Sequence, residues 1–177
     1  MGEIVGQPDR IVERVPAYHW FVLFILTLVS VLNFVDRQVL YILIEPIRKD
    51  LQISDTQIGL LTGVSFAMVY AVAGLWIARV ADRGRRNLVI AGAVIVWSAA
   101  TAIGGLAQNY WQLAASRLGV AAGESGSTPA AHSLITDLFP PSRRAFAVAL
   151  FATGTPIGVM VGYVGGGWFA NHFSWRV

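Results

Sequence analysis

The stretch Ala81-Asp82-Arg83-Gly84-Arg85-Arg86 (residues 81–86) is a short, strongly cationic connection between two long apolar runs, 58–80 and 88–107. About 20 residues at about 1.5 Å each cross the hydrocarbon of a bilayer as a helix, so each run is long enough to span a membrane. Short loops that carry arginine stay on the cytoplasmic side. The stretch therefore predicts two membrane helices joined by a cytoplasmic turn.

The composition extends this prediction to the whole chain. Hydrophobic residues make up 55% of the 177 residues, and charged residues make up 13%, against about 25% in a typical soluble domain. The mean hydropathy is +0.60. The net charge of +3 comes from arginines in short loops rather than on one amphipathic face, which argues against a nucleic-acid partner. The chain is predicted to be an all-α membrane protein without cofactor or metal, and the absence of cysteine excludes disulfides.

The alternation of apolar runs and polar connections predicts the organisation of the chain. Residues 1–16 are expected to be a cytoplasmic segment, and 17–177 an incomplete N-terminal transmembrane bundle. Pro46 is expected to end the first span. The pattern Ser54-Asp55-Thr56-Gln57 predicts a capping box at the start of the second. The five predicted spans are 17–44, 57–80, 87–107, 110–139 and 145–173.

This arrangement places the N-terminus and residues 81–86 and 140–144 on the cytoplasmic side. Eight of the 13 basic residues then lie inside and three outside, in agreement with the positive-inside rule. We therefore expect a multi-pass protein of the cell membrane, which is the inner membrane if the source is bacterial. Five spans are an odd number, so a sixth helix and a second half of the same protein are expected beyond this chain.

Small residues recur at every fourth position in three spans, which permits close helix contacts in lipid. Pro129 and Pro156 are expected to kink the fourth and fifth spans. The stripe of the fifth span, with Pro156 as a hinge position, consists of Gly154, Gly158, Gly162 and Gly166. The stripes of the fourth and second spans are Ala115, Gly119, Gly123, Ser127, Ala131 and Gly59, Gly63, Ala67, Ala71.

Four charged residues lie deep within spans: Asp36, Arg37, Arg117 and Glu124. A charge at bilayer depth costs about 2.5–3.5 kcal/mol on insertion scales, so these side chains need partners or water. Helical spacing puts Asn33, Asp36 and Arg37 on one face of the first span. Arg117 and Glu124 are seven residues apart, so they share one face of the fourth span. Asp36 can pair with Arg117, or exchange that partner with Glu124 and Arg37. Such a network either carries protons or only holds the helices together.

Several motifs resemble the major facilitator superfamily and, within it, the spinster-like branch. The basic connection 81–86 is similar to the loop signature between helices two and three of that superfamily. The stretches 33–38, 54–61 and 123–141 are similar to bacterial spinster homologues. The resemblance implies a monomeric twelve-helix transporter with two six-helix halves that rock around a central cavity to give alternating access.

The resemblance also implies roles for individual residues. Asp36 and Glu124 would be proton-linked carboxylates, with Arg117 and Arg37 as their cationic partners. The candidates for binding the cargo are Asn33, Arg37, Arg117 and Glu124. The resemblance to spinster-like proteins implies that this chain belongs to a transporter of an amphiphilic cargo of lysophospholipid or sphingoid type. Asp82 would cap a helix of the second half. The expected latch at the cytoplasmic end comprises Asp82, Arg83, Arg85, Arg86 and Asp137.

Two other interpretations remain open at this point. A symporter of small organic anions, such as sugar acids, also carries an Asn-x-x-Asp-Arg run on its first helix, and residues 33–37 fit that pattern. The motif Gly123-Glu124-Ser125-Gly126 matches the Gly-x-Ser-Gly pattern of intramembrane serine proteases. Ser125 lies far from a helix start and beside a charged residue, so we expect a transporter rather than an enzyme. His132 is expected to be structural, because it lies on a different face from Glu124.

Overall fold

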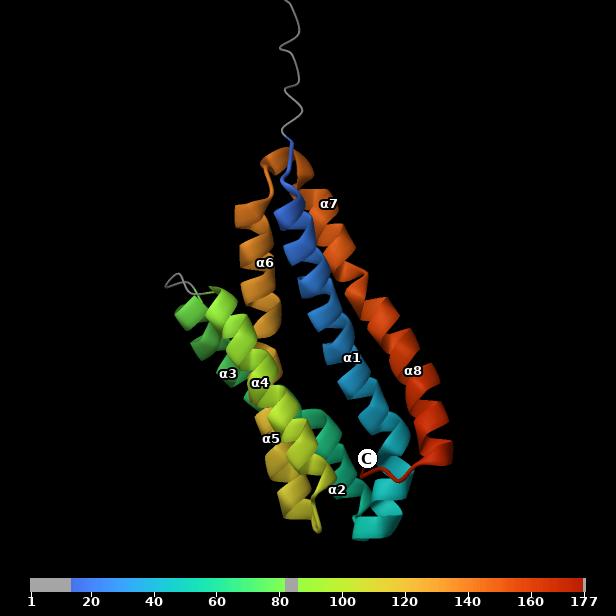
Figure 1. Cartoon of the computed structure of the whole chain (residues 1–177). Coiled ribbons are helices and arrows are strands. Elements are labelled where there is room, and N and C mark those ends of the chain that lie inside the picture. The colour runs from blue at the N-terminus through green and yellow to red at the C-terminus, as the bar shows by residue number, and fades with distance from the viewer. Residues whose placement is uncertain (1–13, 82–85, 177) are drawn as a thin grey trace, which may run out of the picture.

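The computed structural model describes residues 14–81 and 86–176, which form helices joined by short connections and contain no strand. These residues make five helical rods (Figure 1). The first rod is α1 (Ala17–Leu51), and the third is α4 (Arg86–Gly105). The second rod contains α2 (Asp55–Gly59), the π-helix η1 (Leu60–Val64) and α3 (Ser65–Ala81). The fourth contains α5 (Tyr110–Ser125) and α6 (Ser127–Leu138), and the fifth contains α7 (Pro141–Ala152) and α8 (Gly154–His172).

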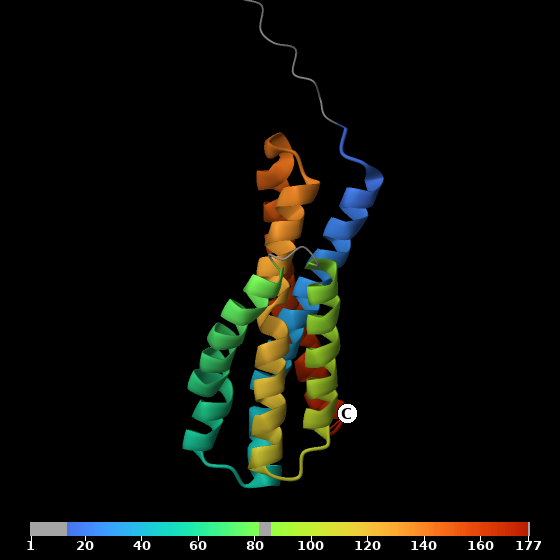
Figure 2. The ribbon, with the colours of Figure 1, turned by 90° about the vertical axis from the view of Figure 1, so that its left-hand side faces the viewer.

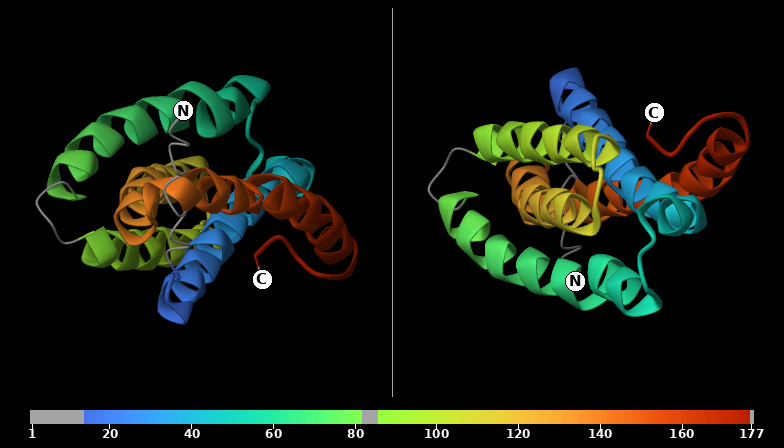
Figure 3. Two further views of the ribbon diagram at one scale, coloured as in Figure 1. Left: turned by 90° about the horizontal axis from the view of Figure 1, so that it is seen from above. Right: turned by 90° about the horizontal axis from the view of Figure 1, so that it is seen from below.

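The rods run up and down, and successive connections lie at opposite ends of the bundle. The start of α1 and the α6–α7 turn lie at one end, whereas the α1–α2 and α4–α5 connections lie at the other (Figure 1). α5 packs between α3 and α4, as Figure 2 shows, and α8 packs along α1. The views along the bundle in Figure 3 separate these two groups of helices. The alternation of ends that the sequence predicts is therefore present in the fold.

Four rods are long and apolar enough to cross a membrane by length and composition: Ala17–Leu51, Asp55–Ala81, Arg86–Gly105 and Pro141–His172. Their outward surfaces carry large exposed apolar side chains, including Trp76 and Ile95. The rod of α5 and α6 is not among the four, because its charged and hydroxyl side chains lower its hydropathy. Its membrane span remains a prediction from the sequence.

The predicted end of the first span at Pro46 is wrong, because α1 continues through Pro46 to Leu51. Proline removes only one helical hydrogen bond here, that to the carbonyl four residues earlier. The next residue, Ile47, is buried in an apolar cluster with Ile53 and Leu113, and this packing favours continuation of the helix. The helix ends at Gln52, whose φ is 51° and whose amide donates to the carbonyl of Arg48.

The second rod begins as predicted and then departs from a regular helix. Ser54 Oγ accepts from the amide of Gln57 at 3.3 Å, and the Ser54 amide donates to Gln57 Oε1 at 2.8 Å, which confirms the capping box. Within η1, Gly63 has non-helical angles of φ −111° and ψ −106°. The small-residue stripe of this rod is exposed, and a Cβ added at Gly59 or Gly63 meets nothing within 4 Å. The predicted packing of that stripe is not found among the described residues.

The fourth and fifth rods each change helix one turn before a proline. α5 gives way to α6 at Gly126, and α7 gives way to α8 at Thr153. Pro129 and Pro156 follow by three residues and cannot donate to the carbonyls of Ser125 and Ala152. Each rod is therefore interrupted one turn before the proline at which the sequence predicts a kink.

The glycine stripe of α8 packs against α1 as predicted. Gly154, Gly158, Gly162 and Gly166 are all buried. A Cβ at Gly158 would lie 2.5 Å from the carbonyl oxygen of Val31, so the two backbones touch. The stripe of the fourth rod packs on α4 over part of its length, where a Cβ at Gly123 would lie 2.7 Å from the amide nitrogen of Trp97.

Candidate functional site

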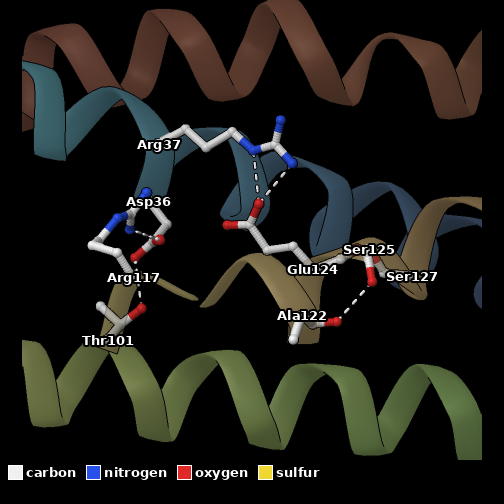
Figure 4. Close-up of polar contacts among 8 residues, drawn as sticks. All are labelled: Asp36, Arg37, Thr101, Arg117, Ala122, Glu124, Ser125 and Ser127. Carbon is white, nitrogen blue, oxygen red and sulfur yellow. Dashed lines mark hydrogen bonds and ion pairs between the residues drawn. The ribbon is translucent and has the colours of Figure 1, made fainter. Parts of the chain in front are cut away.

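The four charged residues predicted within spans come together between α1 and α5 (Figure 4). Asp36 and Arg37 are adjacent on α1, and Arg117 and Glu124 lie two turns apart on α5. Because α5 lies between α3 and α4, its charged face is covered by other helices, and Arg117 and Glu124 are buried. Each acid pairs with the arginine of the other helix, so two ion pairs connect α1 with α5.

The pair of Arg37 and Glu124 contains the most deeply buried acid of the four charged residues. Arg37 donates from Nε to Glu124 Oε2 at 2.7 Å, and its Nη2 lies 2.7 Å from the same oxygen. The Glu124 side chain has 0% exposure, and that of Arg37 has 26%. The second carboxylate oxygen, Oε1, is buried without a hydrogen-bond partner among the described residues. Only one of the two carboxylate oxygens of Glu124 therefore has a hydrogen-bond partner among the described residues.

The pair of Asp36 and Arg117 is longer, and neither of its side chains is as exposed as that of Arg37. Arg117 Nη1 lies 3.4 Å from Asp36 Oδ2, and the hydroxyl of Thr101 on α4 donates to Asp36 Oδ1 at 3.0 Å. The Asp36 side chain is 16% exposed. Both carboxylate oxygens of Asp36 are therefore occupied, in contrast to those of Glu124 (Figure 4).

A cavity of about 220 Å³ lies beside the Asp36 pair. α1 contributes an apolar wall that includes Val39, Leu40 and Leu43, while Asp36 and Arg117 form its polar part. Glu124 and Arg37 are not among the lining residues. The two ion pairs thus have different surroundings, because one faces a cavity and the other is enclosed by side chains.

The C-terminal residues of the described chain lie at the far end of this cavity. Trp175 and Arg176 belong to its lining. Asp50 at the end of α1 accepts from Trp175 Nε1 at 3.1 Å and from Arg176 Nη2 at 2.6 Å. Arg176 also donates to the carbonyl of Ala107 in the α4–α5 connection. These bonds tie together the end of α1, the end of α8 and the α4–α5 connection.

Three residues that the sequence reasoning missed surround the arginines. Arg37 Cζ lies 5.3 Å from the ring centroid of Phe66 and 5.0 Å from that of Tyr70. Arg117 Cζ lies 5.2 Å from the same Phe66 ring. Thr101, which bonds Asp36, is the third. Phe66 and Tyr70 are spaced i, i+4 in the second span, and this pattern was the signal that could have placed them on one face.

Asn33 does not join the ion pairs, although it shares their face of α1. It is buried, and its Nδ2 has no hydrogen-bond partner among the described residues. It lines a separate small cavity with Ser127 and Phe151. His132 stacks edge-on against Phe151 with ring centroids 5.1 Å apart, in keeping with a structural role.

One contact of the predicted latch lies within the described residues. Arg86 at the start of α4 forms an ion pair with Asp137 on α6, and its Nη1 also lies 3.4 Å from the carbonyl of Ser133. The other latch residues, Asp82, Arg83 and Arg85, lie outside the described residues. The Asp137 side chain is 61% exposed, so the pair is accessible to solvent.

Ser125 is not arranged as a nucleophile. Its hydroxyl is buried and donates to the carbonyl of Ala122 at 2.7 Å (Figure 4). His132 contacts Phe151 instead of Ser125. A serine nucleophile needs a base within hydrogen-bond reach, and among the described residues none is bonded to Ser125. The geometry gives no support to the intramembrane protease interpretation.

Comparison with known proteins places this arrangement in a family. A family model described as the Major Facilitator Superfamily matches residues 26–177. The chain belongs to the major facilitator superfamily. A crystal structure of a bacterial homolog to the human lysosomal transporter spinster, inward-facing and unoccupied, matches with a TM-score of 0.77 and 38% identity. That match covers 90% of this chain and 38% of the other, and it confirms the predicted fold and the spinster-like branch.

Two named relatives have sequences similar to most of this chain. An MFS-type efflux pump of Mycolicibacterium smegmatis is 44% identical over 161 residues, covering 91% of this chain and 38% of that protein. Protein spinster of Drosophila melanogaster is 30% identical over 173 residues, covering 96% and 28%. The efflux pump is a transporter by name, and the shared family is one of transporters rather than enzymes. The chain is therefore a multi-pass membrane protein of a transporter superfamily.

Two further relatives have cargoes in their names. A sphingosine-1-phosphate transporter of Danio rerio is 30% identical over 155 residues, covering 82% of this chain and 31% of that protein. A hexuronate transporter of Bacillus subtilis is 31% identical over 156 residues, covering 88% and 37%. The chain spans 28–38% of the length of these relatives and of the matched structure.

Proposed function

We propose that the chain forms part of a proton-coupled secondary transporter that works by alternating access, with Asp36 and Glu124 as its proton-linked acids. The observation that carries the proposal is that two ion pairs connect α1 and α5, each with an acid from one helix and an arginine from the other. Removing one partner of a buried ion pair costs about 3–5 kcal/mol, because it leaves the other charge unpaired. Protonation of an acid removes its charge in the same way, so it can drive a rearrangement of the two helices.

The charge balance of the cluster favours a cargo with a negative group. Two acids and two arginines sum to zero, and the uptake of one proton leaves a net charge of +1. An anionic group of the cargo can compensate that charge at the freed arginine, since guanidinium groups bind carboxylates and phosphates with two parallel hydrogen bonds. Arg117, which lines the cavity, is in position for this role, and Arg37 beside it is the second candidate.

The wall of the cavity beside Asp36 favours a cargo with an apolar tail. Val39, Leu40, Leu43 and Ile47 line it along α1. An amphiphile of lysophospholipid or sphingoid type with a phosphate in its head has a negative group and an apolar tail that suit this lining, and one relative is a sphingosine-1-phosphate transporter. We infer that such a lipid-like solute is the cargo.

A small organic anion is the second candidate. The hexuronate transporter among the relatives supports it, because a sugar acid provides the same negative group without a tail. In both candidates a negative group of the cargo binds an arginine. The candidates differ in the part of the cargo that contacts the apolar wall of the cavity. A sugar acid would require polar donors where this cavity has aliphatic side chains.

The proposed setting is the cell membrane, which is the inner membrane if the source is bacterial, with the N-terminus in the cytoplasm. The Arg86–Asp137 pair, with Asp82, Arg83 and Arg85, would latch the cytoplasmic end. We propose that the transporter is a monomer in which a sixth helix and a second helical half complete the cavity.

Transport by the full-length protein in proteoliposomes tests the function. Lysophospholipids, a sphingoid phosphate and a sugar acid are offered separately, each with and without a pH gradient. Uptake of a lipid-like solute that rises with the gradient supports the proposal. Gradient-driven uptake of the sugar acid alone supports the second candidate. Uptake that is the same with and without the gradient contradicts proton coupling.

A further inference from the structure

One aromatic ring contacts both arginines of the site. Arg37 Cζ lies 5.3 Å and Arg117 Cζ lies 5.2 Å from the ring centroid of Phe66, with each guanidinium over the ring. A cation over an aromatic face is stabilised by about 0.5–2 kcal/mol, and most where water is excluded. Phe66 therefore holds two cations that belong to two different ion pairs.

The irregular part of the second rod puts Phe66 in this place. η1 ends at Val64, and Gly63 within it is non-helical. A π-helical turn changes the direction of the side chains that follow it, and such turns are frequent at functional sites. Tyr70 follows one turn after Phe66, and the two rings stack at 6.2 Å with an interplanar angle of 22°.

The groups around Phe66 come from four helices. α1 contributes Asp36 and Arg37, and α5 contributes Arg117 and Glu124. α3 adds the phenol of Tyr70, and α4 adds the uncharged hydroxyl of Thr101. Each acid has one arginine, although Asp36 and Arg37 are neighbours in the chain. Adjacent residues on a helix do not face each other, so the exchange that matters is that of Arg37 and Arg117 between the two acids, and the Phe66 ring lies against both guanidinium groups.

We propose that Phe66 is a positioning residue that keeps Arg37 paired with Glu124 and Arg117 paired with Asp36. Its consequence for transport rests on the proposed function: with fixed partners, each acid gains and loses its proton beside one particular arginine. Loss of the ring frees both arginines together, and either arginine can then serve either acid.

A double-mutant cycle on thermal stability tests the pairing without any transport. In the full-length protein, Asp36→Asn and Glu124→Gln are combined, and the departure of the combined shift in Tm from the sum of the single shifts measures the coupling of the two acids. Coupling is expected while Phe66 is present, because the acids belong to one ion-pair network. In a Phe66→Leu background this departure should change by about 3 °C or more, because either arginine can then serve either acid. The same departure in both backgrounds overturns the proposal.

Conservative and control variants separate positioning from packing. Phe66→Tyr keeps the ring and should keep the wild-type coupling of the two acids, whereas Phe66→Met fills similar space without a ring and should change it. Phe66→Met also replaces Phe66→Leu if that variant does not fold. Phe24→Leu, on α1 and 64% exposed, is the matched control and should leave the cycle unchanged. If Phe66→Tyr changes the coupling as Phe66→Met does, the ring is not the cause and the proposal fails.

The pH profile of transport supplies the second readout. Phe66→Met should broaden or shift the pH dependence of uptake, while Phe66→Tyr and Phe24→Leu keep the wild-type profile. A wild-type profile in Phe66→Met, with uptake still pH-dependent, contradicts the positioning role. If the wild-type protein itself shows no pH dependence, the proposed function fails, and the thermal cycle alone decides the role of Phe66.

Discussion

α1 makes two contacts of opposite kinds, one with α8 and one with α5. Toward α8 the backbones touch through the buried glycines of α8, and a Cβ at Gly158 would lie 2.5 Å from the carbonyl oxygen of Val31. Toward α5 the contact is made by the long side chains of two ion pairs, at 2.7 and 3.4 Å. The first contact has no freedom to change its spacing, whereas the second can change by exchanging a partner or a proton.

This difference indicates which parts of the bundle move together. Interfaces of small residues gain their stability from dense van der Waals contact, which a shift of a few tenths of an ångström already weakens. Ion pairs in a buried site change strongly when one charge is neutralised. We expect α1 and α8 to act as one rigid unit, and the α1–α5 contact to be the one that protons regulate.

Neutralising the enclosed acid should have the largest effect. Glu124→Gln removes the charge that Arg37 bonds, at a side chain with 0% exposure, which corresponds to about 3–5 kcal/mol for a broken buried pair. We expect gradient-driven uptake to fall at least about 100-fold and to lose its pH dependence. Glu45→Gln, at a 58% exposed acid on α1, is the matched control and should transport normally. Retained pH dependence in Glu124→Gln would remove this acid from the coupling role.

Adding a methyl group to the rigid contact should have the next largest effect. Gly158→Ala forces a Cβ against the backbone of α1, and overpacking of this kind costs about 1–3 kcal/mol. We expect a lower Tm and a lower yield of folded full-length protein. Gly165→Ala, on the same helix with nothing within 4 Å, should be neutral or slightly stabilising. Equal Tm values for the two variants would contradict the account of the α1–α8 contact.

Neutralising the acid beside the cavity should have a smaller effect than neutralising Glu124. Asp36→Asn keeps a partner for Thr101 and loses a pair that is longer and partly exposed, which corresponds to about 1.5 kcal/mol. We expect uptake to fall about 10-fold and its pH dependence to change. Asp55→Asn, at an 80% exposed acid, serves as the control. A larger loss in Asp36→Asn than in Glu124→Gln would reverse the proposed ranking of the two pairs.

Breaking the solvent-accessible pair should have the smallest effect. Asp137 is 61% exposed, and exposed ion pairs contribute about 0.2–1 kcal/mol. Asp137→Asn should increase labelling of single cysteines from the cytoplasmic side by about 2- to 5-fold, without loss of folded protein. Thr136→Ala on the same helix is the control, because its hydroxyl bonds only within α6. Unchanged labelling in Asp137→Asn would argue against a latch formed by this pair.

Local features of the fold followed from the sequence wherever neighbouring residues decide them. The capping box at Ser54, the interruptions near Pro129 and Pro156, and the buried glycines of α8 were all predicted. Pro46 misled the prediction, because the burial of Ile47 extended the helix beyond it. The exposed stripe at Gly59 and Gly63 also differed, since no described helix packs against it.

The sequence predicted which residues form the candidate site, but it left open which arginine pairs with which acid. A charged side chain within an apolar run is conspicuous, because its burial costs free energy unless it serves a function. The four residues Asp36, Arg37, Arg117 and Glu124 could therefore be chosen without a structure. Which arginine serves which acid depends on the rotation and spacing of α1 and α5, and helical periodicity within one helix does not determine these. Thr101 was missed because its role comes entirely from its position on a third helix.

The sequence by itself determined that this chain forms apolar helices in alternating directions, which carry four charges at bilayer depth and one face of closely spaced glycines. Hydropathy, periodicity and the energetic cost of a buried charge are properties of the residues and need no partner. Only the tertiary structure decided that Arg37 bonds Glu124, that Arg117 bonds Asp36, and that the ring of Phe66 contacts both arginines. Those contacts join residues far apart in the chain, and their geometry is set by how the backbones pack.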